Sequence, residues 1–516
     1  MAQYPVRVNL SMMAFPFLSE LSGRSIIVKQ QDQNYAASVT SSSDLDKDIG
    51  IPSLFYCHNV IATGHGYQAI YYKQIYNPIG GVSTVVDIFQ VFDSAASGRT
   101  YICYDKSGNF YYAQNYVGLR SPNNYWTFCN SIPAAAGKEI TTATVNGITY
   151  IYIANIGCYK FDFTLRSLVA VTLTGLVAAD ILGVVGVSGY LIAWTKSVIA
   201  WSSLLSPTDF TPSLATGAGG GSVQGARGDI VVCLAHTVGF VVYTNQNAVA
   251  ASASQNSRYP WNFRELVASG GLSNKNLATY DANTGNHYVY TSSGLQMISL
   301  QQAQTTIPEL TDFLAGSVFE DFDEDTNTLR VTALSTVMKK RFTLISDRYL
   351  IVSYGVTELT HALIYDLVTK RWSKLKFTHV SVFENSLLTI EVSETPRNSI
   401  AFMTKSGSVS LVVIDSRESN SSGVVLLGKY QFIRQRTATL QYIDVENVIN
   451  PDYITCLDLY TLDGKTLLQA DPANHIHSGL NCRFFFTVTG VNHSILFKGF
   501  FNLASLEVVL VNHGRR

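Results

Sequence analysis

The chain has 516 residues, of which 47% are hydrophobic and only 14% are charged, and its formal net charge is -1. This length allows several domains and a large buried core. The near-neutral charge argues against a protein whose main task is to grip nucleic acid by releasing counterions. The seven cysteines are scattered and form no CxxC pair. This argues against a disulfide framework or a zinc site and fits assembly in a reducing cytoplasm.

Residues 1–80 do not follow the pattern of the remaining chain. They contain a polar loop, SSSDLDKD at residues 41–48, followed by an apolar stretch at residues 51–72. We therefore expect an irregular N-terminal arm that leads into a strand and serves for docking.

Residues 81–423 repeat one pattern, in which an apolar strand-like run reaches a turn and a second such run follows. The copies lie at residues 100–113, 150–162, 190–203, 232–244, 287–300 and 399–414, with a variant at 362–375. Hairpins at intervals of roughly 40 to 55 residues are typical of β-propeller blades. We expect an all-β fold with a propeller of roughly six to eight blades. Strands from both chain ends often close such a ring, and residues 81–92 are a candidate for this closure.

Residues 167–194 are apolar and form the best candidate for a membrane span. Four glycines and many β-branched residues favour successive buried strands with glycine turns over a spanning helix.

The pattern changes at about residue 424. Residues 424–516 contain longer strand-like runs with looser turns, and they predict a small C-terminal β-rich domain that closes the propeller or docks on another protein. No segment has a sustained period of 3.6 residues, so we expect little helix.

The basic run TKRWSKLKF at residues 369–377 supplies the candidate DNA or interface contacts. They are Lys370, Arg371, Trp372 and Lys374. Basic residues interleaved with an aromatic residue suit a phosphate backbone. The alternative is a solvent-facing strand of a blade, which the near-neutral net charge favours.

Three further segments contain residue types that occur in ligand or metal sites. The glycine-rich residues 217–229 lack the lysine of a phosphate-binding loop and predict a flexible loop between blades. The acidic residues 320–327 lack the ordered spacing of a calcium loop, and His475 and His477 lack a third ligand. No catalytic motif is present. We therefore expect no enzyme activity, no metal and no cofactor.

Two stretches carry a resemblance to a known family. YCHNVIATGHGYQAIYY (residues 56–72) resembles the N-V-x-P-T-x-x-G-Y segment of tail proteins of short-tailed bacteriophages, with Ala62 in place of the usual proline. Residues 199–252 are similar to the middle of phage tail nozzle, or packaged-DNA stabilisation, proteins. The shared features are a W/Y-S-x-L-x-x-P-x-x-F/W strand end, a polar loop and a strand pair that ends in a Y-T/S turn.

The resemblance implies a structural virion protein that is assembled in the bacterial cytoplasm and located in the tail. Six copies would form a tube that retains packaged DNA and guides its ejection, with transient contact to double-stranded DNA in the lumen. The implied partners are a portal-adaptor protein and tail fibre or tail needle proteins, with no stable membrane insertion. The candidate lumen gate is the loop at residues 211–228, represented by Thr211, Gly217, Gly219, Gln224 and Arg227.

Two other functions fit a propeller. A host-surface carbohydrate-binding module would need exposed aromatic residues on the blade tops, and Tyr259 and Trp261 are the candidates. A propeller hydrolase would place acidic residues at the axial mouth, and the absence of a catalytic motif argues against it.

Overall fold

A computed structural model describes most of the chain. The described residues are 3–9, 25–28, 37–38, 54–63, 66–81, 84–114, 125–254, 260–281, 283–307, 310, 314, 318–323, 328–333, 339–345, 348–385, 399–413, 420–432, 438–447, 454–462, 465–470, 475–478, 481–490 and 492–512. Within these residues the elements are β-strands and short 3-10 helices, namely η2 (Pro133–Ala135), η3 (Ala178–Asp180) and η4 (Lys275–Leu277). This confirms the predicted all-β class.

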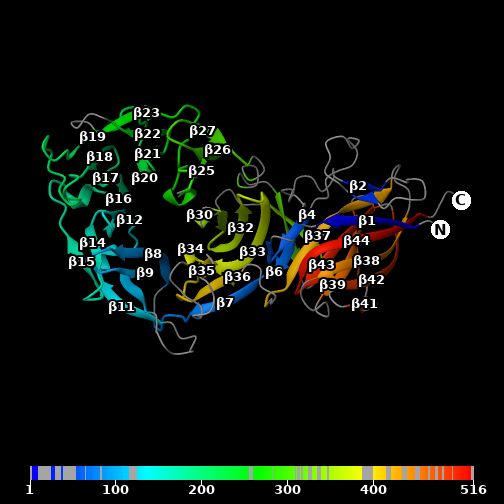
Figure 1. The fold of residues 1–516 in the computed structure, drawn as a ribbon. Helices are drawn as coiled ribbons and strands as arrows, with labels where there is room; N and C mark the ends of the chain where they lie inside the picture. Colours follow the sequence, from blue (N-terminus) through cyan, green and yellow to red (C-terminus); the bar gives the residue numbers. More distant parts are fainter. Residues whose placement is uncertain are drawn as a thin grey trace.

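Seven units of four antiparallel strands follow one another around a ring (Figure 1). The first two units are joined into one eight-stranded sheet, and the sixth belongs to a larger sheet described below. The first three units are β8 (Val85–Asp93), β9 (Gly98–Asp105), β10 (Asn109–Gln114), β11 (Tyr125–Ser131); β12 (Ile140–Val145), β13 (Ile148–Ile153), β14 (Gly157–Asp162), β15 (Ser167–Val171); and β16 (Gly183–Val187), β17 (Tyr190–Trp194), β18 (Val198–Trp201), β19 (Gly219–Ser222). The fourth and fifth are β20 (Ile230–His236), β21 (Gly239–Thr244), β22 (Ala248–Ala253), β23 (Trp261–Glu265); and β24 (Ala278–Tyr280), β25 (His287–Thr291), β26 (Gly294–Ile298), β27 (Ala303–Thr305). The last two are β30 (Lys339–Ile345), β31 (Tyr349–Gly355), β32 (Leu359–Asp366), β33 (Arg371–His379); and β34 (Ser381–Asn385), β35 (Ser399–Met403), β36 (Val409–Val413), β7 (Tyr71–Tyr76). A separate hairpin, β28 (Val318–Asp323) and β29 (Thr328–Ala333), lies between the fifth and sixth units in the chain.

This arrangement is a seven-bladed β-propeller, within the predicted range of blade numbers. The first strand of each blade is its inner strand, since β12, β16, β20 and β24 contact one another in that order and β34 contacts β8. Blade 7 is closed by β7, which comes from the N-terminal part of the chain and pairs with β36. We expected residues 81–92 to close the ring. Most of them instead form β8, the inner strand of blade 1.

Turn chemistry explains why successive strands fold back locally. Asn146 and Gly147 both have positive φ, at 50° and 76°, and join β12 to β13 as a two-residue loop. Ser188 and Gly189 do the same between β16 and β17. Two-residue loops with positive φ at both positions match the right-handed twist of the strands that they connect.

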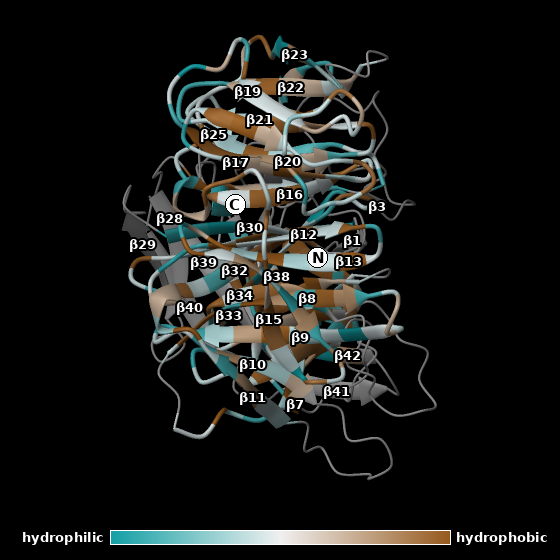
Figure 2. Ribbon diagram, turned by 90° about the vertical axis from the view of Figure 1, so that its left-hand side faces the viewer, coloured by the Kyte–Doolittle hydropathy of each residue, from teal (hydrophilic) through white to brown (hydrophobic). Residues whose placement is uncertain are grey.

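The hydrophobic core lies in layers between neighbouring blades. One cluster joins blades 1 and 2 and contains Ile102, Phe110 and Ile151, all of which are fully buried. Another joins blades 7 and 1 across the closure. Hydrophobic residues are concentrated on the strands in Figure 2, whereas many connecting loops are hydrophilic. Each blade therefore buries its faces against its neighbours, which a single hairpin cannot do.

Strands from both ends of the chain build a second body, a two-sheet sandwich. One sheet contains β1 (Gln3–Asn9), β3 (Ala37–Ser38), β38 (Ala438–Asn447), β41 (His475–Ser478), β42 (Asn481–Gly490) and β44 (Asn502–Asn512). The other contains β2 (Ser25–Val28), β4 (Leu54–His58), β37 (Gly423–Phe432), β39 (Ile454–Leu462), β40 (Lys465–Ala470) and β43 (Asn492–Gly499). Residues 1–80 and 424–516 therefore contribute to one sandwich, and both termini lie at its far end (Figure 1).

A short hairpin joins the sandwich to the propeller. Its strands are β5 (Val60–Ala62) and β6 (Tyr67–Ala69). Strand β5 pairs with β33 of blade 6, and β6 pairs with β44 of the sandwich. One continuous sheet therefore runs from β30 through this joint to β41.

The remaining fold predictions can be compared directly. All seven predicted hairpins are pairs of adjacent strands, and residues 167–194 form β15, β16 and β17. Cys103 and Cys158 are buried, as expected, and the six cysteines whose side chains are described are free thiols. Among the described residues, no helix is long and apolar enough to cross a membrane.

Candidate functional site

The inner strands begin together at one mouth of the propeller axis. Because each blade starts with its inner strand, the first residues of these strands converge from all sides. Asp87 lies near the start of β8, Glu139 directly precedes β12, and Lys275 lies in η4 before β24. Arg341 is the third residue of β30. Four blades thus place a charged side chain at the same mouth.

These four residues form two ion pairs between blades that are not neighbours. Arg341 Nη2 lies 2.9 Å from Asp87 Oδ1 and links blade 6 to blade 1. Lys275 Nζ lies 3.5 Å from Glu139 Oε2 and donates a hydrogen bond of 3.0 Å to the carbonyl oxygen of Ile140, which links blade 5 to blade 2. Burial lowers the pKa of Lys275, and the charges of Glu139 and Asp87 oppose this shift. The charged side chains therefore span this end of the channel.

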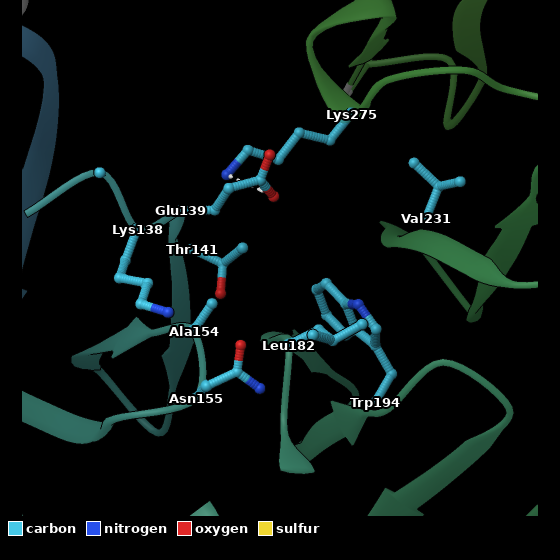
Figure 3. A pocket seen from close by; sticks show the side chains of 10 residues that line it. Lys138, Glu139, Thr141, Ala154, Asn155, Leu182, Trp194, Val231 and Lys275 are labelled. Carbon is cyan, nitrogen blue, oxygen red and sulfur yellow. Dashed lines mark ion pairs between the residues drawn. The ribbon is translucent and has the colours of Figure 1, made fainter. Parts of the chain in front are cut away.

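A cavity of about 220 Å³ opens beside Lys275 (Figure 3). Lys138, Glu139, Thr141 and Asn155 lie on one side of it, and Leu182, Trp194 and Val231 lie on the other. Trp194 packs over Gly183, where an added Cβ would collide with its indole ring. Its Nε1 atom is buried and has no hydrogen-bond acceptor among the described residues.

The chemistry available at this mouth is ionic recognition. Both of these carboxylates are ion-paired with a cation, Asp87 with Arg341 and Glu139 with Lys275. No group of three or more His, Cys, Asp or Glu side chains able to hold a metal occurs among the residues that the structure describes. Lysine, amide, hydroxyl and indole groups make the cavity wall rich in hydrogen-bond donors.

The predicted basic strand is β33, and it is buried in the joint. Arg371 is 5% exposed and donates from Nη1 to the carbonyl oxygen of Gly66 at 3.2 Å and from Nη2 to that of Thr63. Trp372 packs against Tyr365 in a tilted arrangement with ring centroids 4.5 Å apart.

Lys374 is 4% exposed and lies close enough to Cys57 to oppose the rise of that thiol's pKa, which burial brings to about 12. Of the four candidate contacts, only Lys370, in the preceding turn, is exposed. The expectation of a DNA-facing or solvent-facing strand is corrected for Arg371, Trp372 and Lys374, because they are enclosed between the propeller and the sandwich.

The predicted gate loop lies at the outer edge of blades 3 and 4. Gly219 belongs to β19, the outermost strand of blade 3, and the carbonyl oxygen of Gly217 accepts a hydrogen bond of 2.9 Å from Trp201 Nε1. Arg227 Nη2 lies 2.7 Å from Glu265 Oε1. Thr211 and Gln224 are exposed. Part of this segment is thus an ordered strand rather than a loop, and its gating role stays a prediction.

The other candidate residues fall in different places. Tyr259 lies outside the described residues, and Trp261 is buried against Phe240, with ring centroids 5.0 Å apart. Trp261 therefore presents no exposed platform for a sugar, which corrects that expectation. The acidic residues 320–323 lie in β28, and His475 and His477 lie in β41, on whose side chains the structure gives no description.

Sequence reasoning did not identify Asp87, Glu139, Lys275 or Arg341. They are far apart in the chain and belong to no motif. What they share is a position at the start of an inner strand, and this signal becomes readable only once the strands have been assigned to blades.

No protein-family model and no curated protein matches this chain. Among solved structures, the WD40 β-propeller domain of Doa1 is similar with a TM-score of 0.38 at 8% identity, covering 68% of this chain and 100% of that one. The extracellular domain of BT4673 from B. thetaiotaomicron has a TM-score of 0.40 at 11% identity, covering 93% and 65%. Sqt1 from Saccharomyces cerevisiae has a TM-score of 0.34 at 10% identity, covering 62% and 82%.

Proposed function

We propose that this chain is a structural virion protein, the tail nozzle of a short-tailed bacteriophage, without enzymatic activity. Six copies would form a tube that retains packaged DNA and guides its ejection. The observation that carries the proposal is the continuous sheet from blade 6 to the sandwich, combined with the resemblance of residues 56–72 and 199–252 to such proteins. A sheet shared by two bodies resists their relative movement, as the wall of a conduit must.

The closed axis of the propeller defines where the conduit would run. Lys275 and Arg341 reach across one mouth to partners on other blades, so a DNA duplex has no path along the axis of a single chain. The lumen would therefore lie between the six copies. Low net charge suits this role, because strong binding to phosphates would hinder movement of the DNA.

The docking partners follow from the same proposal. The sandwich carries both chain ends and projects away from the ring (Figure 1), and we assign it to the contact with a portal-adaptor protein. Tail fibre or tail needle proteins would bind elsewhere on the assembly. The virion tail is the proposed location, after assembly in the host cytoplasm.

Mass measurement in solution tests the assembly. Sedimentation velocity over a range of concentrations should show a species of six times the 56.6 kDa chain, alone or after addition of the adaptor protein. A chain that stays monomeric at the highest concentration in both conditions would contradict the proposal.

The gate can be tested without disturbing the blade. Deletion of residues 215–225 would remove β19, so the charge substitutions Gln224→Glu and Arg227→Glu are more informative. If this segment faces DNA, particles that carry both substitutions should lose packaged DNA, or release it early, relative to particles with the control substitution Lys106→Glu on the turn after β9. Unchanged DNA retention would place the gate elsewhere.

A further inference from the structure

We propose that the axial cavity binds a small monocarboxylate with a compact apolar body, a ligand that the nozzle function does not require. The site combines ammonium groups with an apolar wall, and its residues come from blades 2, 3, 4 and 5. Such convergence of separate elements on one concave site is typical of binding pockets.

The charges of the mouth favour an anion. The charged residues that line the cavity are two lysines, Lys138 and Lys275, and one carboxylate, Glu139, so the lining carries one excess positive charge. The Lys275 side chain is 19% exposed, whereas that of Glu139 is 60% exposed. Because water screens Glu139 more than Lys275, an incoming carboxylate can compete for the ammonium group.

The opposite wall selects the body of the ligand. Leu182, Val231 and Trp194 bound the cavity there, and Trp194 is only 2% exposed. The volume of about 220 Å³ is smaller than the range of roughly 300–1,000 Å³ that suits drug-sized molecules. A flat acid with roughly ten non-hydrogen atoms therefore fits the cavity better than an oligosaccharide or a nucleotide. The buried Nε1 donor of Trp194 has no acceptor among the described residues, and an oxygen of the ligand would supply one.

Calorimetry with the full chain tests this with benzoate as the probe and benzamide as its neutral control of the same shape. We expect saturable binding of benzoate and none of benzamide. Lys275→Met should weaken benzoate binding by about tenfold or more, because a hydrogen bond to a charged group is lost. Trp194→Phe, which keeps an aromatic side chain but removes the pyrrole ring with its Nε1 donor, should weaken it by about threefold or more.

Lys370→Met is the matched control. Lys370 carries the same charge, is exposed in the turn between β32 and β33 of blade 6 and does not line the cavity, so its loss should leave binding unchanged. Unfolding curves of each variant distinguish lost binding from lost structure. The proposal is overturned if benzoate gives no saturable heat, if benzamide binds equally well, or if folded Lys275→Met binds benzoate like the unaltered chain. Inorganic phosphate that binds as tightly as benzoate would also overturn it, because the apolar wall would then contribute nothing.

Discussion

The propeller and the sandwich are both all-β, yet they draw their strands from the chain in opposite ways. Blades 1 to 6 are each made of four consecutive strands, whereas the sandwich pairs β1 with β44 and β2 with β37 from opposite chain ends. The ring therefore rests mainly on local contacts, with β7 as its one closure strand from outside the run. The sheets of the sandwich are complete only when both ends of the chain are present. Because local contacts form faster than contacts between distant segments, we expect the blades to fold before the sandwich.

The two regions meet at the hairpin of β5 and β6, and buried polar contacts hold this joint together. Arg371 binds two carbonyl oxygens of the hairpin, and the backbone N–H of Ala62 donates to Ser373 Oγ at 2.7 Å. Rigidity between the two bodies therefore depends on a few buried residues. Substitutions at the joint should lower the free energy of unfolding more than similar substitutions at the ring surface.

The largest effect is expected for Gly66→Ala. A Cβ at Gly66 would overlap the backbone oxygen of Leu503 in β44, and the backbone cannot move aside as a flexible side chain could. We expect a loss of about 3 kcal/mol or more in the free energy of unfolding, measured by urea denaturation. Gly221→Ala in β19, where an added Cβ meets nothing within 4 Å, should change it by less than about 0.5 kcal/mol. Equal effects of the two substitutions would refute the close packing of the joint.

Arg371→Met should have the second largest effect on the free energy of unfolding. It leaves the carbonyl oxygens of Thr63 and Gly66 buried without this donor, and we expect a loss of about 2–4 kcal/mol. Lys376→Met on the same strand is the control, since Lys376 is exposed, and it should stay within about 0.5 kcal/mol. If Arg371 faces solvent or DNA instead, its substitution will change the free energy of unfolding as little as that of Lys376.

Acid should weaken the ring through two buried histidines. Burial lowers the pKa of His287 and of His379 to about 4, and the neighbouring charges of His236 and Arg341, respectively, act in the same direction. His287 accepts from Tyr243 and donates to the carbonyl oxygen of Ala235, while His379 bonds to Ser353 and to the carbonyl oxygen of Phe377.

The sign of the effect follows from these lowered values. The unfolded chain takes up protons as the pH falls below about 6.5, whereas the folded chain does not until about pH 4. Stability is thus complete above pH 6.5 and falls between pH 6.5 and 4, by on the order of 3 kcal/mol for each histidine. Thermal unfolding across this range measures it. His287→Gln should be less stable at pH 7 but should show a flatter pH profile, and an equally steep profile would contradict the assignment.

The smallest effect is expected for Arg227→Gln at the outer edge of the ring. Its ion pair with Glu265 is largely exposed to solvent, so we expect a change of less than about 0.5 kcal/mol in unfolding free energy. Chemical denaturation at low and high salt measures it. A larger loss of unfolding free energy that does not depend on salt would show that the Arg227–Glu265 contact stabilises the fold, and that this segment is not a free surface for gating.

Local patterns made the ring and a C-terminal β-rich domain predictable, but they did not predict the N-terminal strands of the sandwich or the axial mouth. Alternating apolar runs with turn residues such as Asn146-Gly147 specify hairpins wherever they fold. The partner of β1 or β7 depends on contacts hundreds of residues away, which no local pattern encodes. The expectation for the basic strand was wrong for the same reason. Arg371 and Lys374 resemble surface cations in the sequence, but they are buried where β33 pairs with β5. Asp87 and Arg341 form an ion pair only because the ring closes.

Electron microscopy of the purified assembly tests the central claim most directly. We predict six-fold rings whose lumen lies between the subunits, with seven-bladed propellers closed along their own axes and sandwiches extending to one end. Images of single particles without rotational symmetry, or rings in which DNA passes through the axis of each propeller, would contradict the account.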